Sequence, residues 1–316
     1  MQGNRLPPFV MLLASLCATL GGCCGPQTEK PIIAPPPISL EEQVSRLTRW
    51  AGSFPRLQAK TVDRGVTIKS RDENGQAHTD YVEGALLIRR PADILLVGLA
   101  LSKRAFDAGS NADVWWFADR YQTHTAWIGD ARAPVEFSRL RSASSEMRLS
   151  ALRADLVLDL LALSDLPDLH KPPAAQRGRL LTMRVNDVAA TNDLWIEQLP
   201  TTPAPAAAAL PGAARLVREI IVDRLTDEIR EVRLYDDAGV LAVQSILTHY
   251  APVTLGEEGE ASAAKGPRFP YRITINYMVE HLSISLEFAT VSVPTEPFSD
   301  AAFQPNIEGL KVIRVE

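Results

Sequence analysis

The sequence predicts a mainly β fold of the α+β class, in which an antiparallel sheet is accompanied by two helices. Short segments of alternating apolar and polar residues recur along most of the 316-residue chain, as expected for strands with one buried face. Turn signals separate these segments, and the clearest are Asn74-Gly75 and Asp236-Asp237-Ala238-Gly239. Most of the connections are too short for helical crossovers, so neighbouring strands should run antiparallel.

The first element in the chain is an export signal. Residues 1–25 begin with a positively charged part and continue with an apolar stretch that is too short for a stable membrane span. The end of this stretch resembles the lipobox of bacterial lipoproteins, with the sequence Leu20-Gly21-Gly22-Cys23. The resemblance implies that residues 1–22 are a signal peptide, cleaved between Gly22 and Cys23, and that the Cys23 thiol carries the acyl chains.

Lipidation at Cys23 has consequences for location. Buried acyl chains contribute about 0.8 kcal/mol per methylene, which anchors a doubly or triply acylated chain durably in a membrane. In the bacterial sorting scheme, an Asp directly after the lipidated cysteine favours retention in the inner membrane. Here that residue is Cys24, so the outer membrane is favoured, facing the periplasm. Residues 23–38 are then the lipidated cysteine and a Pro-rich, extended tether. Two alternatives stay open: Cys24 as the modified residue, and an ordinary signal peptide without lipid.

The remaining elements follow from local patterns. A helix should begin after the capping-box pattern Ser39-Leu40-Glu41-Glu42. Leucines at helical spacing predict a second helix over 145–163. Strands are expected before it over 66–69, 81–88, 93–101, 104–108, 114–119 and 123–128, and after it over 179–185, 192–199, 216–223, 231–235, 240–250, 271–279 and 281–288. Strands of similar type continue on both sides of the low-complexity segments, so residues 39–316 are predicted to form one domain.

Several function classes are excluded by composition and by missing motifs. The net charge of -5 does not suit a nucleic-acid-binding chain. All three cysteines lie in the first 25 residues, which leaves the folded body without a thiolate metal site or a cysteine nucleophile. The five histidines are scattered, and no phosphate-binding, dinucleotide-binding, metalloprotease or serine-hydrolase motif is present. We therefore expect no catalytic residues, no metal, no cofactor and no enzymatic activity.

Two strands are unusually apolar on both faces. Adjacent residues of a strand point to opposite sides, so Trp115-Trp116-Phe117 places large aromatic side chains on both faces. Residues 93–101 have the same two-sided character. In a single-layer sheet, such strands need a cover on both faces or a ligand on one.

The order of these elements resembles the LolA/LolB-like superfamily of bacterial lipoprotein carriers and receptors. The most specific local matches are a strand, a basic Pro turn and a strand over residues 84–96, and a turn into an aromatic strand over residues 109–117. The resemblance implies a half-open antiparallel barrel whose apolar side holds acyl chains beneath the leucine-rich helix, which would act as a lid. The receptor-type member is itself a lipoprotein and uses an apolar tip between two strands; the corresponding turn here, Arg89-Arg90-Pro91-Ala92, is basic.

The first hypothesis is therefore a membrane-anchored periplasmic lipoprotein that binds an apolar ligand, such as an acyl chain or a lipoprotein, in lipid or lipoprotein trafficking. The alternative is a structural or interaction lipoprotein of the envelope with a filled core and no ligand. Protein partners are not predicted, and the membrane is contacted through the acyl anchor. The candidate groove residues are Leu95, Val97, Leu99, Trp115, Phe117, Leu156, Leu160, Ile273, Ile275, Ile284 and Leu286.

Overall fold

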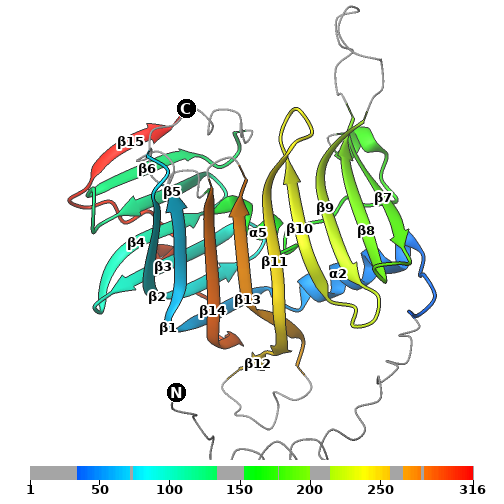
Figure 1. Cartoon of the computed structure of the whole chain (residues 1–316), viewed down its shortest axis with the longest axis horizontal. Helices are drawn as coiled ribbons and strands as arrows, with labels where there is room; N and C mark the ends of the chain where they lie inside the picture. The colour runs from blue at the N-terminus through cyan, green and yellow to red at the C-terminus, as the bar shows by residue number, and fades with distance from the viewer. Residues whose placement is uncertain are drawn as a thin grey trace, which may run out of the picture. The chain divides into compact units, whose positions relative to one another are not determined.

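Within the residues that the computed structural model describes, fifteen strands pair into one sheet with β7 and β15 at its edges (Figure 1). The described residues are 34–71, 74–133, 153–176, 178–199, 214–256, 266–278 and 281–315. The strands are ordered β15-β6-β5-β4-β3-β2-β1-β14-β13-β11-β10-β9-β8-β7, and β12 pairs with β14. Neighbours are antiparallel except for the parallel pairs β12–β14 and β6–β15. The chain from Pro35 to Glu316 is one compact unit.

The fold class predicted from the sequence, a mainly β protein with a curved antiparallel sheet and an N-terminal helix, is confirmed. The helical elements are α2 (Leu40–Gly52), α5 (Asp155–Leu160), η2 (Pro173–Gln176) and η4 (Asp300–Phe303). The strands are β1 (Arg56–Arg71), β2 (Ala77–Arg89), β3 (Asp93–Ala100), β4 (Lys103–Ser110), β5 (Val114–Asp119), β6 (Thr125–Asp130), β7 (Arg179–Asn186), β8 (Thr191–Gln198), β9 (Arg215–Asp223), β10 (Ile229–Tyr235), β11 (Leu241–Pro252), β12 (Thr254–Leu255), β13 (Arg268–Tyr277), β14 (Leu282–Val293) and β15 (Lys311–Val315). None of the helices in the described residues is long and apolar enough to cross a membrane.

The sheet has an inner face, against which α2 and α5 pack, and an outer face. The alternation in β13 and β14 sets the inner face, because Ile275 pairs directly with Ile284 and both are buried in the main core. The helix α2 begins as expected: the Ser39 side chain accepts a hydrogen bond from the Glu42 backbone N–H over 3.2 Å. Leucine and alanine side chains of α2 join the same core, so helix and sheet bury one continuous apolar layer.

The second helix is shorter than the sequence indicates. The stretch 145–152 lies outside the described residues, and the described part, α5, is a helix of 6 residues that ends at Leu160. The prediction of helix over 161–163 is wrong, because Ala162 takes a left-handed backbone conformation with φ of 52°. This turn directs Leu161 and Leu163 into the core, where both are fully buried. The leucines at these positions therefore reflect burial in an irregular turn and not a longer helix.

The C-terminal part of the chain covers the outer face of β2–β6, which the sequence analysis did not predict. Residues 298–306, called here the C-terminal cover, place Phe303 against Leu95 and Trp116 in a second apolar cluster. The cover is fixed by Asn111, whose side-chain N–H donates to the Phe303 carbonyl over 3.0 Å. Beyond it, β15 adds to β6 in parallel. The two-sided apolar character of β3 and β5 is thus satisfied by protein on both faces.

Candidate functional site

The inner face contains an apolar pocket directly beneath α5. Its volume is about 30 Å³, which is large enough for a water molecule and too small for an acyl chain. Side chains of β2, β3, β4, β13 and β14 form its floor, and Ala154 and Val157 close it from the side of α5. The full lining is Leu86, Ile94, Leu96, Ala108, Ala154, Val157, Ile275, Tyr277, Ile284 and Leu286.

Most of the groove residues predicted from the sequence lie in the main core. The core contains Trp115, Phe117, Leu156, Leu160, Ile273, Ile275, Ile284 and Leu286. Of these, Ile275, Ile284 and Leu286 also line the pocket itself. The face chosen for β3 is the opposite one: Leu95 and Val97 pack in the outer cluster beneath Phe303. The partly buried Leu99 belongs to neither cluster. The inner positions of β3 are Ile94 and Leu96, which the sequence analysis missed.

A signal for the missed residues exists in the strand pairing. Leu96 lies opposite Leu86 on β2 and Ala108 on β4, so these three residues form one row across the inner face. The alternation of β2 predicts that Leu86 and Ile88 share a face, and the pairing register then carries this assignment to β3. On β3 alone, the run Ile94-Leu95-Leu96-Val97 gives no preference for either face.

A few polar contacts hold α5 on the sheet. The Ser245 hydroxyl on β11 donates to the Leu160 carbonyl at the end of α5. On β9, Arg218 donates to the Asp159 carboxylate over 2.5 Å and to the Ser164 hydroxyl over 2.6 Å. Burial lowers the pKa of Arg218 from its ordinary value, and the Asp159 carboxylate opposes this effect. Together these bonds fix the C-terminal end of α5 and the turn after it.

The N-terminal end of α5 is held by a buried ion pair. Arg153 donates to the Asp155 carboxylate over 2.7 Å, and its guanidinium lies over the Trp115 ring at 5.7 Å. Burial raises the pKa of Asp155 from its ordinary value, and the contact with Arg153 opposes this shift. The Arg153–Asp155 pair, together with hydrogen bonds from Arg153 to the Ala131 and Ala133 carbonyls, anchors the start of the short helix above an aromatic strand.

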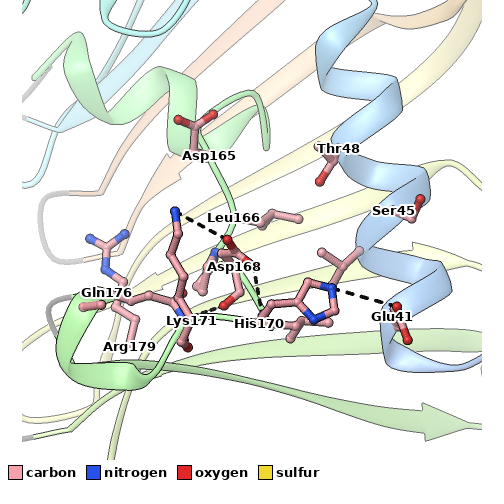
Figure 2. A pocket seen from close by; sticks show the side chains of 14 residues that line it. Glu41, Ser45, Thr48, Asp165, Leu166, Asp168, His170, Lys171, Gln176 and Arg179 are labelled. Carbon is pink, nitrogen blue, oxygen red and sulfur yellow. Dashed lines mark hydrogen bonds and ion pairs between the residues drawn. The ribbon is translucent and has the colours of Figure 1, made fainter.

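A second and larger cavity lies between α2 and the residues that follow α5 (Figure 2). This cleft has a volume of about 930 Å³. One wall is a face of α2, and the other is the chain over 165–171 together with η2 and the start of β7. The lining consists of Glu41, Val44, Ser45, Thr48, Asp165, Leu166, Pro167, Asp168, Leu169, His170, Lys171, Ala175, Gln176 and Arg179. This cleft is not among the sites predicted from the sequence.

Hydrogen bonds and ion pairs give the cleft a defined charge pattern. Asp168 accepts a hydrogen bond from the His170 backbone N–H over 2.9 Å and lies 3.5 Å from the Lys171 ammonium. These two contacts lower the pKa of the Asp168 carboxyl, so it is ionised at neutral pH. Figure 2 shows the Lys171 and Arg179 side chains on the side of the cleft away from α2, and His170 beside Glu41 at the start of the helix.

The described residues contain no group of three or more His, Cys, Asp and Glu side chains that could hold a metal ion. The predicted cleavage and lipidation positions, Gly22 and Cys23, lie outside the described residues.

The sequence matches no protein-family model and no curated protein. Solved structures that this chain resembles in fold include the following three. A LolA superfamily protein from Nitrosomonas europaea has a TM-score of 0.44 at 8% identity, over 85% of this chain and 99% of its own. A DUF1329 family protein from Desulfovibrio piger has a TM-score of 0.46 at 11% identity, over 84% and 96%. A domain from Vibrio parahaemolyticus named for outer membrane lipoprotein sorting has a TM-score of 0.42 at 10% identity, over 85% and 99%. Likenesses at this level do not identify a ligand for this chain.

Proposed function

We propose that this protein is a lipid-anchored, non-enzymatic envelope protein that binds an apolar acyl chain between the inner face of its sheet and α5. The observation that carries the proposal is the apolar pocket beneath α5, which lies at the centre of the inner face and is lined almost entirely by aliphatic side chains. Burial of an acyl chain there would stabilise a complex by about 25 cal/mol per Å² of apolar surface, without any charged contact.

Ligand uptake requires α5 to move, because the pocket in its present form is about 30 Å³. The helix is suited to this. It has 6 residues, too few to be stable in isolation, so its position depends on its contacts with the sheet. Those contacts are the buried leucines and the polar bonds from Ser245 and Arg218. We propose that α5 is a lid whose displacement opens the inner face.

Leu101 is an exposed apolar side chain that could contact a membrane or an acylated partner. Leu101 forms the tip of the β3–β4 hairpin and is 93% exposed. The turn does not require an apolar side chain at this position. Replacement by serine, Leu101→Ser, should change the free energy of unfolding by less than about 0.5 kcal/mol, since the side chain is exposed. The same replacement should reduce sedimentation of the protein with lipid vesicles. Equal sedimentation of both proteins would remove Leu101 from the proposal.

The acyl-binding proposal is tested with two adjacent leucines. Leu96→Ser places a hydroxyl in the pocket, whereas Leu95→Ser changes the outer cluster. We expect Leu96→Ser to weaken binding of a fluorescent fatty acid at least about tenfold, because a buried hydroxyl without a partner opposes an apolar ligand. Leu95→Ser should bind nearly as the unmodified protein does, at a temperature where circular dichroism shows both variants folded. Equal losses in both variants would contradict the proposal.

The filled-core alternative rests on the small volume of the pocket in its present form. It predicts no fatty-acid uptake by any of these proteins. The anchor is tested separately: Cys23→Ser should leave the precursor uncleaved and unlabelled by radioactive fatty acid, and normal processing of this variant would exclude lipidation at Cys23.

A further inference from the structure

The outer face of the sheet from β1 to β7 differs from the covered outer face of β2–β6. Among the described residues, the outer apolar cluster contains no side chain of β1, β14, β13 or β7–β11. Figure 1 shows β1, β14, β13, β11, β10, β9 and β8 side by side, with α2 and α5 behind them on the inner face. Most side chains on the outer face of these strands are half-buried or exposed, so they can contact a partner.

The pairing register aligns the side chains of this face in rows that cross the strands. One row consists of Tyr81, Thr67, Ser285, Thr274, Ile246, Glu231, Ile221, Asp193 and Arg184. The next row consists of Thr79, Lys69, Ser283, Asn276, Gln244, Arg233, Glu219, Trp195 and Thr182. Neighbouring strands lie about 4.8 Å apart, so each row extends over about 40 Å along the sheet. We call these two rows the double row.

The double row carries no net charge. Its three basic and three acidic side chains are Lys69, Arg184 and Arg233 against Asp193, Glu219 and Glu231. Arg233 donates to both the Glu219 and the Glu231 carboxylates, so opposite charges are paired within the face. Nucleic acids and anionic lipid surfaces bind to clusters of Lys and Arg, which the double row does not provide. Its charge pattern therefore favours an uncharged partner.

Two amide side chains in the double row have hydrogen-bonding groups in reserve. Gln244 on β11 and Asn276 on β13 lie directly opposite each other and are both half-buried. Gln244 uses its amide N–H group to donate to Glu231, and the Asn276 carbonyl accepts from the Ser283 hydroxyl over 2.8 Å. Within the described part of the chain, the Gln244 carbonyl and the Asn276 amide N–H group have no partner. A free acceptor and a free donor on adjacent strands match the N–H and the carbonyl of an acetamido group.

The remaining side chains of the double row suit a sugar. Hydroxyls of Thr67, Thr274 and Ser285 can both donate and accept, as sugar hydroxyls can. Aromatic rings, which pack against the C–H faces of sugar rings, lie towards both ends: Tyr81 is 56% exposed, and the half-buried Trp195 ring is held by a 2.8 Å hydrogen bond to Glu219. Amides, hydroxyls and aromatic rings thus follow one another along a straight line.

From these observations we propose that the double row binds an extended, uncharged glycan strand that carries acetamido groups. The acetamido group is recognised between Gln244 and Asn276, and the neighbouring sugars lie along the rows towards Trp195 and Tyr81. This site is on the opposite face of the sheet from the pocket beneath α5, and it goes beyond acyl binding.

The test uses the intact chain and isothermal titration calorimetry with three probes. Chitopentaose is an extended chain of β1,4-linked N-acetylglucosamine. Cellopentaose has the same linkage and length without the acetamido groups, and N-acetylglucosamine is the single sugar.

The matched variants are Gln244→Ala and Gln198→Ala. Gln198 is exposed at the end of β8 and has the strand parity of Ile196, which points into the main core, so it does not belong to the double row. Asn276→Ala is a second variant of the proposed acetamido contact. Circular dichroism shows whether each variant is folded.

We expect chitopentaose to bind at least about tenfold more tightly than cellopentaose or N-acetylglucosamine. Gln244→Ala and Asn276→Ala should each remove most of this preference, and Gln198→Ala should leave it within about twofold. No binding of chitopentaose, equal affinity for the two pentasaccharides, or equal effects of Gln244→Ala and Gln198→Ala would overturn the proposal.

These outcomes are independent of the proposed function. Leu96→Ser should leave chitopentaose binding within about twofold, because Leu96 lines the pocket on the inner face. A parallel loss of fatty-acid and chitopentaose binding in this folded variant would contradict the assignment of the glycan to the outer face.

Discussion

The two parts of the sheet differ in how their outer faces are completed. Strands β2–β6 are covered on both faces, by the main core inside and by the C-terminal cover outside. Among the described residues, the apolar side chains that cover β8–β11 belong to the main core on the inner face, and the outer cluster contains no residue of these strands. Their outer face is polar and is organised around Glu219, which accepts hydrogen bonds from Trp195, Arg233 and Tyr235 over 2.8, 3.0 and 2.8 Å.

This difference indicates which part of the protein is rigid and which part can move to admit a ligand. A strand layer enclosed by protein on both sides has apolar side chains that cannot move without opening a cavity. The pocket beneath α5 has its floor partly in this enclosed region, in β2–β4, and its cover in a short helix. The cleft lies against β7, at one edge of the sheet. We infer that β2–β6 provide a fixed floor, and that movement is confined to α5 and the residues after it.

The largest effect is expected at the centre of the C-terminal cover. Phe303→Ala removes a ring that is 1% exposed and should lower the free energy of unfolding by about 3–5 kcal/mol. On the outer face of β11, Ile246→Ala removes a side chain that is 38% exposed and should cost less than about 1 kcal/mol. Urea denaturation of both variants measures the comparison, and similar losses would show that the C-terminal cover is not an energetic part of the core.

The C-terminal cover also shows which part of the fold the sequence can predict. The hairpins and the inner residues of β13 and β14 follow from alternation and turn signals, which are local. The face of β3 does not follow from its own residues, because Leu95 and Leu96 are equally apolar. Leu95 packs against Phe303, about 200 residues further along the chain, and Leu96 lines the inner pocket. The parallel edge strand β15 was not predictable for the same reason, since its pairing with β6 depends on where the preceding C-terminal cover ends.

An intermediate effect is expected for the bond that holds the end of α5. Ser245→Ala removes the hydroxyl that donates to the Leu160 carbonyl and should cost about 1–2 kcal/mol, because that buried carbonyl loses its partner. If α5 is the moving part, the variant should also show faster amide hydrogen exchange in α5 with unchanged exchange in β3 and β5. Faster exchange throughout the sheet would mean that α5 and the sheet open together.

The candidate sites were predictable to different degrees. The apolar character of the inner face was predictable from Ile275, Ile284 and Leu286, because strict alternation marks a buried face. The cleft was not, because the 165–171 segment has neither a strand nor a helix period, and it faces α2 only through the tertiary fold.

The smallest effect is expected on the polar outer face. Burial and the Glu219 carboxylate raise the pKa of Tyr235 to about 12. Because this value lies above the ordinary value of 10.0, the hydrogen bond stabilises the fold fully below about pH 10, and this contribution is lost as the pH rises towards 12. Tyr235→Phe should therefore reduce the loss of stability over that interval, as measured by urea denaturation at each pH. An unchanged profile would mean that Tyr235 does not contribute to it.

Whether the inner face accepts an acyl chain beneath α5 can be measured by native mass spectrometry with lipid extraction on the Pro35–Glu316 unit, purified without detergent. We expect an acyl lipid bound in near-stoichiometric amount. A ligand-free mass, together with no uptake of a fluorescent fatty acid, would contradict it and would indicate a filled core.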